Sequence, residues 1–195
     1  NATADLVVGS ITTSNAAITL TSGTGSITTG VLTTTSSGSS SPVTLTAANY
    51  ISTNSITGSS LLLKADSDGN GSGYVHVANL TTGGGNITVG GGSGTISAGS
   101  GYATGSNTNN TQYGVSASNI NAGGGSIIIN GIGGTYASGT NYGANIGSIQ
   151  TTGTGTINIH GTGGTAGTNN YGIYVSGVTN SSGSGAITLA GTAGT

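Results

Sequence analysis

Residues 142–165 read YGANIGSIQTTGTGTINIHGTGGT, and this stretch decides the fold class because its pattern recurs on both sides. The Tyr-Gly pair that opens it recurs every 29 residues, at Tyr113, Tyr142 and Tyr171. The apolar-x-apolar triplet near its end recurs every 30 residues, starting at Ile127, Ile157 and Ile187. A repeat of this size, built from short alternating segments, predicts a solenoid whose coils stack on one another.

Along the whole chain the apolar-x-apolar triplet occurs seven times. Alternate side chains of a strand point to opposite faces, so the two apolar residues of each triplet should face a core and the middle residue should face solvent. The triplets are Ile18-Thr-Leu20, Val43-Thr-Leu45, Leu61-Leu-Leu63, Ile87-Thr-Val89, Ile127-Ile-Ile129, Ile157-Asn-Ile159 and Ile187-Thr-Leu189. We expect them to stack as one parallel sheet in an all-β solenoid of about seven coils.

Each later coil is expected to contain two more short strands. The second strands open at Tyr74, Tyr113, Tyr142 and Tyr171, and the third strands open at Asn79, Asn119, Ser148 and Gly177. A Gly-rich corner then leads to the next triplet, since glycine adopts positive φ without steric cost. We therefore expect a cross-section with three faces. Variable loops should lie on one side of the solenoid, at residues 64–73, 90–112, 130–141 and 160–170.

The composition fits an extended β-structure and limits the partners. The chain has 41 glycines, no cysteine and a net charge of −2. Nucleic acid is excluded as a partner, because phosphate binding needs a basic patch and Lys64 is the only basic residue. No apolar run approaches the roughly 18 residues of a transmembrane segment. We expect a single solenoid domain over residues 1–195, and a segment of a longer repetitive protein because the last coil carries no cap.

One loop carries a pattern with metal-binding chemistry. Asp66, Asp68 and Asn70 place side-chain oxygens at alternate positions, and a glycine stands at the sixth position, as in the first half of a calcium loop. The match ends at the twelfth position, where an EF-hand has a glutamate and this chain has Val77. Two interpretations stay open: a weak calcium site, or an Asx-rich turn with a flexible tip. No other cofactor is expected.

The other candidate site is a column of four tyrosines, Tyr74, Tyr113, Tyr142 and Tyr171. Rings stacked at equivalent positions of successive coils form either a sugar-binding strip or structural packing, and packing is the commoner role beside a solenoid. The two side chains that titrate near neutrality are His76 and His160. We expect both imidazoles to be isolated and solvent-facing, because no third metal ligand lies nearby in the sequence.

A run of similar motifs extends the pattern over the chain: Gly9-Ser-Ile-Thr12, Ala17-Ile-Thr-Leu20, Gly25-Ser-Ile-Thr28, Val43-Thr-Leu-Thr46 and Asn86-Ile-Thr-Val89. This run resembles the β-helical shaft of filamentous-haemagglutinin-like exoproteins, which are large adhesins exported by two-partner secretion or as autotransporter passengers. The resemblance implies a right-handed parallel β-helix, export across a bacterial outer membrane, and a role in adhesion or in extending a distal tip from the cell. No binding residues of the family transfer, because the shared motifs are structural.

An enzyme is the competing class, since parallel β-helices also host polysaccharide lyases and hydrolases. Such enzymes need acids, or a basic residue with bound calcium, that converge on one groove. This chain has three acidic residues, and its only close pair, Asp66 and Asp68, shares one loop. We therefore expect no catalytic residues and no enzymatic activity.

The expected function is that of a non-enzymatic structural shaft of a bacterial surface adhesin or extracellular fibre. Its near absence of charge favours self-association into fibres, and its location would be extracellular or on the bacterial cell surface. The alternative is a carbohydrate- or ice-binding solenoid module, with host or surface glycans as partners in the first case. Outward threonines at 19, 44 and 88 favour an ice-binding face, but Leu62, Ile128 and Asn158 interrupt that ladder.

Overall fold

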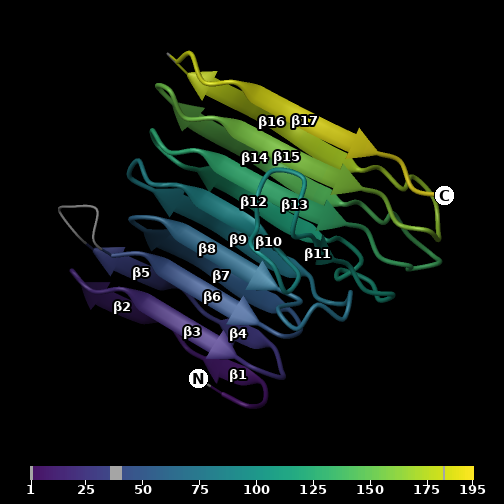
Figure 1. The fold of residues 1–195 in the computed structure, drawn as a ribbon, viewed down its shortest axis with the longest axis horizontal. Helices are drawn as coiled ribbons and strands as arrows, with labels where there is room; N and C mark the ends of the chain where they lie inside the picture. Colours follow the sequence, from purple (N-terminus) through teal and green to yellow (C-terminus); the bar gives the residue numbers. More distant parts are fainter. Residues whose placement is uncertain (1, 36–40, 182) are drawn as a thin grey trace.

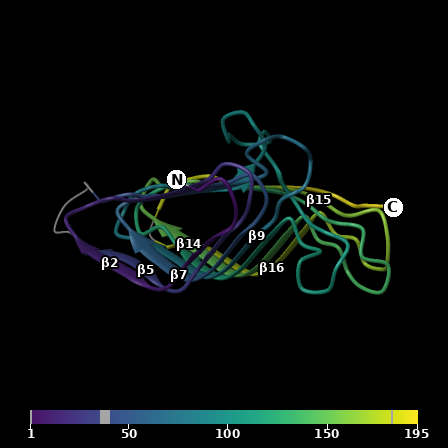
Figure 2. The same cartoon turned by 90° about the horizontal axis from the view of Figure 1, so that it is seen from below.

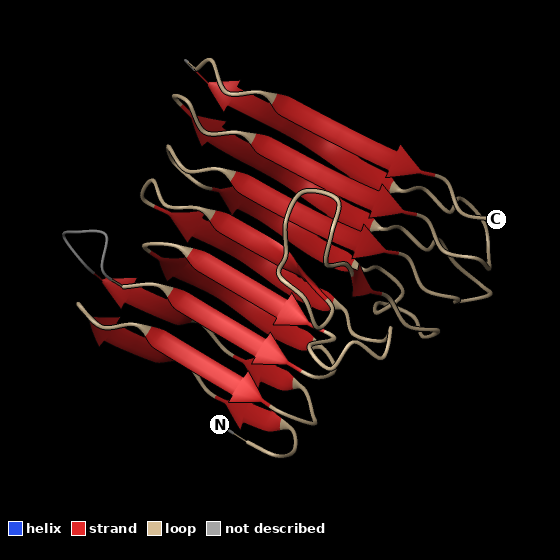
Figure 3. Ribbon diagram, in the orientation of Figure 1, coloured by secondary structure: helices blue, strands red, loops and turns tan. Residues whose placement is uncertain are grey.

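The computed structural model describes residues 2–35, 41–181 and 183–195, and in these ranges all regular structure is β-strand (Figure 3). The strands form two parallel sheets that face each other across a thin core (Figures 1 and 2). Sheet A contains β3 (Ile18–Ser22), β6 (Val43–Ala47), β8 (Leu61–Ala65), β10 (Ile87–Gly91), β11 (Ala103–Thr104), β13 (Ile127–Ile132), β15 (Ile157–Thr162) and β17 (Ile187–Thr192). Sheet B contains β1 (Leu6–Val8), β2 (Ile11–Ser14), β4 (Ile27–Thr29), β5 (Leu32–Thr35), β7 (Ile51–Gly58), β9 (Val75–Thr82), β12 (Val115–Asn121), β14 (Ala144–Thr152) and β16 (Ile173–Ser181).

The seven triplets stack in sheet A, as the sequence predicts. Their strands follow in the order β3, β6, β8, β10, β13, β15 and β17, and all neighbours are parallel. The first residues of the triplets are direct partners throughout, from Ile18 opposite Val43 to Ile157 opposite Ile187. The all-β parallel solenoid is thus confirmed. It has about six turns and not seven, because seven stacked strands enclose six intervals.

The apolar residues of the triplets form a continuous core column. From Val43 to Ile159 both apolar side chains of each triplet are at most 3% exposed. On β17 the exposed fraction rises to 45% for Ile187 and 47% for Leu189, because this strand has a neighbour on one side. The column is buried wherever a turn lies on both sides of it.

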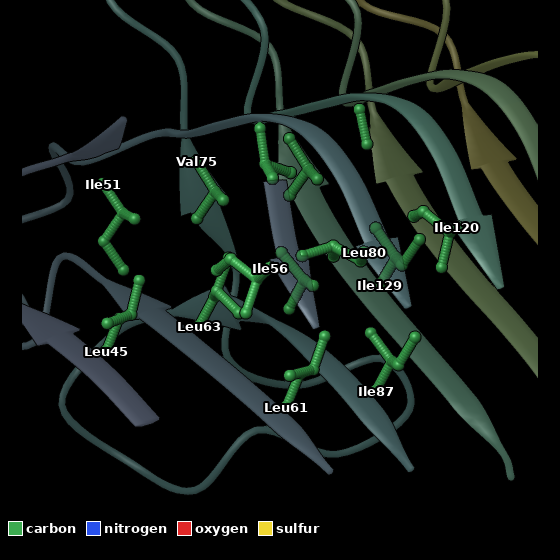
Figure 4. Close-up of a cluster of buried hydrophobic side chains, with 14 of the residues drawn as sticks. Leu45, Ile51, Ile56, Leu61, Leu63, Val75, Leu80, Ile87, Ile120 and Ile129 are labelled. Carbon is green, nitrogen blue, oxygen red and sulfur yellow. The ribbon is translucent and has the colours of Figure 1, made fainter. Parts of the chain in front are cut away.

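Sheet B supplies the other half of the core. Figure 4 shows Leu45 and Leu63 of sheet A meeting Ile51 and Ile56 of sheet B across the narrow interior. Full burial of each such side chain contributes about 1.5 to 3 kcal/mol, whereas ordering each backbone residue costs about 1 to 2 kcal/mol. A single turn therefore has too few buried side chains to fold, and stability depends on stacking.

The structure has two sheets and not the three faces that the sequence predicts. The expected second and third strands of each later coil form one continuous strand. In β9 the inward side chains are Val75, Val77, Leu80 and Thr82, so the alternation shifts by one residue at Ala78. The neighbouring ladders skip the same position and resume at Asn79. In the first turns β4 and β5 are separate strands, and both pair with β7. One intervening residue bends the later strands but does not interrupt the sheet.

Glycines occupy the corner between β9 and β10 and its counterpart in the next turn. A Cβ at Gly85 would collide with the carbonyl oxygen of Ser59, and a Cβ at Gly125 would collide with the carbonyl oxygen of Gly85. The neighbouring Gly123 has a φ of 58°. Glycine is favoured there because it adopts positive φ without steric cost. Successive corners thus stack backbone directly on backbone.

Close backbone contacts at the other end of the cross-section, away from the corner of Gly125, explain the repeat that begins with Tyr-Gly. A Cβ at Gly143 would lie 2.5 Å from the carbonyl oxygen of Gly172 and 2.5 Å from the amide nitrogen of Thr162. Gly161 meets the carbonyl oxygen of Gly172 in the same way. At the Tyr-Gly pair and at the glycine after the triplet, the backbones therefore approach too closely to leave room for a side chain. The variable loops follow this end on one side of the solenoid, except that the segment after β10 turns over sheet A (Figures 1 and 2).

We predict that Ile157→Asp destabilises the fold by roughly 3 kcal/mol or more, because it buries an unpaired carboxylate at a position that is 0% exposed. The matched control is Asn158→Asp, which adds the same charge on the outer face and should cost less than about 1 kcal/mol. Urea denaturation followed by circular dichroism measures both free energies of unfolding. Equal losses in the two variants would contradict the inward column.

We predict a sharp difference between two neighbouring glycines of one corner. Gly125→Ala should cost about 2 kcal/mol or more, since its Cβ meets the backbone of the preceding turn. Gly124→Ala should be neutral or stabilising by about 0.4 to 1 kcal/mol, because no heavy atom lies within 4 Å of its Cβ. The melting temperatures of the two variants report the difference, and equal values would show that the turns do not stack at this spacing.

Candidate functional site

The three residues of the expected calcium loop lie together in one tight turn after β8. Asp66 has a φ of 49°, and its Oδ1 accepts a hydrogen bond of 3.0 Å from the amide of Gly71. Burial raises the pKa of this carboxyl, although backbone hydrogen bonds from Ser72 and Gly71 act in the opposite direction. Asp66 is 4% exposed, so its buried carboxylate stabilises the turn by accepting this hydrogen bond.

Asp68 and Asn70 are exposed at the tip of the same turn. The side-chain nitrogen of Asn70 donates to Oδ2 of Asp68 over 2.9 Å, and the Asn70 amide lies 3.4 Å from Oδ1. Both carboxylates therefore accept hydrogen bonds from within the loop, as in an Asx turn. Within the described ranges, no group of three or more His, Cys, Asp or Glu side chains is placed to hold a metal ion.

The four predicted tyrosines fall into two stacks. Tyr113, Tyr142 and Tyr171 stack with 5.4 Å between successive ring centroids. Tyr74 stacks on Tyr50 instead, at 4.9 Å and an interplanar angle of 4°. The register separates them, because Val75 lies opposite Val115 and Tyr74 is therefore beside Gly114. In the first stack a glycine stands between each tyrosine and its strand, and after Tyr74 none does.

Sequence reasoning missed two members of these stacks. Tyr50 precedes Ile51 as Tyr74 precedes Val75, and this equivalence was the signal that could have found it. Tyr174 lies on the outer face of β16, and its ring stacks on Tyr142 at 5.3 Å. Burial, with a smaller contribution from Tyr50, raises the pKa of Tyr74 to about 12, so this hydroxyl stays protonated. The rings are half-buried or exposed, on the outside of the solenoid.

The two histidines are far apart in the structure. His76 is exposed on the outer face of β9, in the column that contains Ser52 and Ser116. His160 is half-buried on the outer face of β15, where Gly99 of a long loop packs against its ring. The expected solvent-facing position fits His76 better than His160, because the loop over sheet A covers part of the His160 ring.

Polar side chains form a hydrogen-bonded ladder on the outer face of sheet B. On sheet B, Asn79 donates to Ser55 over 3.0 Å, Asn119 donates to Asn79 over 2.8 Å, and Ser148 donates to Asn119 over 2.7 Å. On sheet A the threonine column is interrupted as expected. Its order through the turns is Thr19, Thr44, Leu62, Thr88, Ile128, Asn158 and Thr188.

A groove that the sequence did not predict lies on the outer face of sheet A. Its volume is about 620 Å³, and its lining includes Thr44, Leu62, Lys64, Thr88, Ser93 and Ile96. The floor belongs to the threonine column, and the wall is the segment that follows β10. Sequence reasoning placed this segment among the variable loops on the side of the solenoid. Only the fold shows that it turns over sheet A (Figure 1).

The wall of the groove is held by one buried amide. Asn130 is 0% exposed, and its Nδ2 donates to the carbonyl oxygens of Ser97 at 2.6 Å and Ser100 at 2.7 Å. Its Oδ1 accepts from the amide of Gly99 at 3.3 Å. Ser97 and Ser100 also exchange two backbone hydrogen bonds. A buried amide with these bonds is costly to displace, so the loop is fixed against β13.

No protein-family model, no curated protein and no solved structure matches the chain. Within the part of the chain that the structure describes, no helix has the length and apolar character needed to cross a membrane.

We predict that calcium binds the Asp66 loop weakly at most, because a bound ion must compete with the hydrogen bonds inside the turn. Any rise in melting temperature at millimolar calcium should disappear in the Asp66→Ala, Asp68→Ala double variant. Asp5→Ala is the matched control, since it removes the acid outside the loop and should keep the response. Micromolar affinity in a calorimetric titration would contradict this prediction.

Proposed function

We propose that the chain is a non-enzymatic structural shaft of a bacterial surface adhesin or extracellular fibre. The observation that carries this proposal is the unbroken ladder of sheet A, in which the triplets keep one register from β3 to β17. Each turn adds about 4.8 Å of length with the same backbone pairing. A structure of this kind can be extended without a change in its cross-section, which is what a spacer requires.

The motifs behind the resemblance to filamentous-haemagglutinin-like exoproteins support the same proposal. In this chain they lie in strands: Ile27 opens β4, Val43 opens β6 and Ile87 opens β10. Their Ile, Val and Leu residues face the core, and the threonines between them face outward. We also propose that the chain belongs to this family, that its helix is right-handed, that its location is extracellular or on the cell surface, and that it has a role in adhesion.

Self-association into fibres is the main interaction in this proposal. The sequence has one basic and three acidic residues, so two shafts that meet side by side have little electrostatic repulsion. The outer face of sheet B carries a ladder of Ser and Asn side chains from successive turns. A second copy of the chain presents the same spacing, which favours lateral contact between parallel shafts.

A carbohydrate-binding module is the second candidate function. The stack of Tyr113, Tyr142 and Tyr171 favours it, because aromatic rings with hydroxyl groups recur at a regular spacing along an outer surface. An ice-binding face has less support. Leu62, Ile128 and Asn158 interrupt the threonine column in the structure as they do in the sequence.

We predict that electron microscopy of the natural assembly shows fibres with an axial repeat of about 4.7 to 4.9 Å from the stacked turns. Lateral bundling should persist at high salt, because little charge is involved. Monodisperse short rods that bind a glycan through the tyrosine stack would refute the shaft and favour the binding module.

A further inference from the structure

We propose that the groove over sheet A is a binding site for an acidic saccharide, meaning a sugar unit that carries one carboxylate. Three features carry the proposal: Lys64, the threonine column that forms the floor of the groove, and the loop that forms its wall. It lies in the middle turns of the solenoid, on strands β6, β8 and β10. The inference does not depend on the shaft proposal, since a shaft can carry such a site or lack it.

The groove is preorganised. The segment after β10 turns back over the outer face of sheet A (Figure 2), and residues 93–96 of this segment form one side of the groove. Asn130 fixes the far part of this segment from β13. Ile96 is 9% exposed and anchors the near part by burial. A wall held at both places keeps its shape before a ligand arrives, which reduces the entropy cost of binding.

Lys64 supplies the charge. It is the only basic residue of the chain, and its Nζ donates to the carbonyl oxygen of Ser93 over 3.0 Å at the edge of the groove. An ammonium group has three N–H donors, so this bond leaves donors for a ligand. Among the described residues no carboxylate pairs with Lys64, and none lines the groove. One cation without an ion-pair partner favours a ligand with one negative charge.

The remaining lining selects a sugar. Thr44 and Thr88 flank Leu62 in one column of sheet A, so hydroxyl groups lie on both sides of an aliphatic patch. A sugar ring has the complementary pattern, with hydroxyls at its rim and C–H groups on its face. The volume of about 620 Å³ lies within the range of small-ligand sites. A nucleotide fits less well, because a single lysine leaves most of its phosphate charge unpaired.

The test uses the full chain and two probes, methyl β-D-glucuronide and the neutral methyl β-D-glucoside. In amide NMR spectra, the glucuronide should shift the signals of Lys64, Thr88 and Ser93, and the glucoside should bind at least about tenfold more weakly, or roughly 1.4 kcal/mol. Added salt should weaken the glucuronide alone. Equal affinity for the two probes, or no shift at millimolar glucuronide, would overturn the proposal. Shifts confined to the tyrosine stack would also overturn it.

Variants separate binding from folding. Lys64→Gln keeps a donor for Ser93 but removes the charge, and it should lose about tenfold in glucuronide affinity with an unchanged melting temperature. Lys64→Arg keeps the positive charge and should therefore retain the binding. Thr88→Val should weaken binding, whereas Thr19→Val, in the same column but outside the groove, should leave it unchanged. Full affinity in Lys64→Gln, or equal losses in the two threonine variants, would refute the site. Inorganic phosphate that displaces the glucuronide would show a general anion site and overturn the sugar assignment.

Discussion

The in-register pairing of one turn with the next is the constraint on which the rest of this structure depends. Pairing at about 4.8 Å leaves no space for a side chain wherever backbone lies directly over backbone. Gly85 and Gly125 meet this condition at one corner, and Gly143 and Gly161 meet it at the other end. The glycine content therefore reflects close approach of the backbone more than flexibility. In an earlier turn Ser59 stands where Gly85 and Gly125 stand in the later ones, so the glycine repeat belongs to the later turns.

Buried side-chain amides stabilise two of the loops on this scaffold. Asn141 is 0% exposed, and its side-chain nitrogen donates to Tyr136 over 3.0 Å, to Ala166 and to Asn170 over 3.1 Å. Asn130 does the same for the loop over sheet A. An amide offers two donors and one acceptor, so a single side chain can satisfy several carbonyls of an irregular segment. Each of these two loops is thereby fixed to its own turn or to a neighbouring one.

The sequence was sufficient for those parts of the fold that follow from alternation. The triplet from Ile157 to Ile159 has two inward residues in any strand, and its spacing from Ile127 places it one turn away. Alternation could not show that the strand after Tyr74 continues past Ala78, since that depends on pairing with the neighbouring turn. The groove could not be predicted from the sequence for a similar reason. Lys64 and Ser93 are 29 residues apart, and nothing local brings them together.

Insertions are tolerated at one end of this cross-section because the remaining corners are closed by backbone contact. A longer segment at the corner of Gly125 would have to break the stacking of glycine on glycine. A longer segment after a triplet strand leaves both sheets intact, and the stretch after β10 shows the result, since it crosses β13 without disturbing the register of Ile87 and Ile127. Variation in such a solenoid therefore concentrates after the triplets. The same geometry that keeps the shaft uniform places the groove over sheet A next to Lys64, the only basic residue of the sequence.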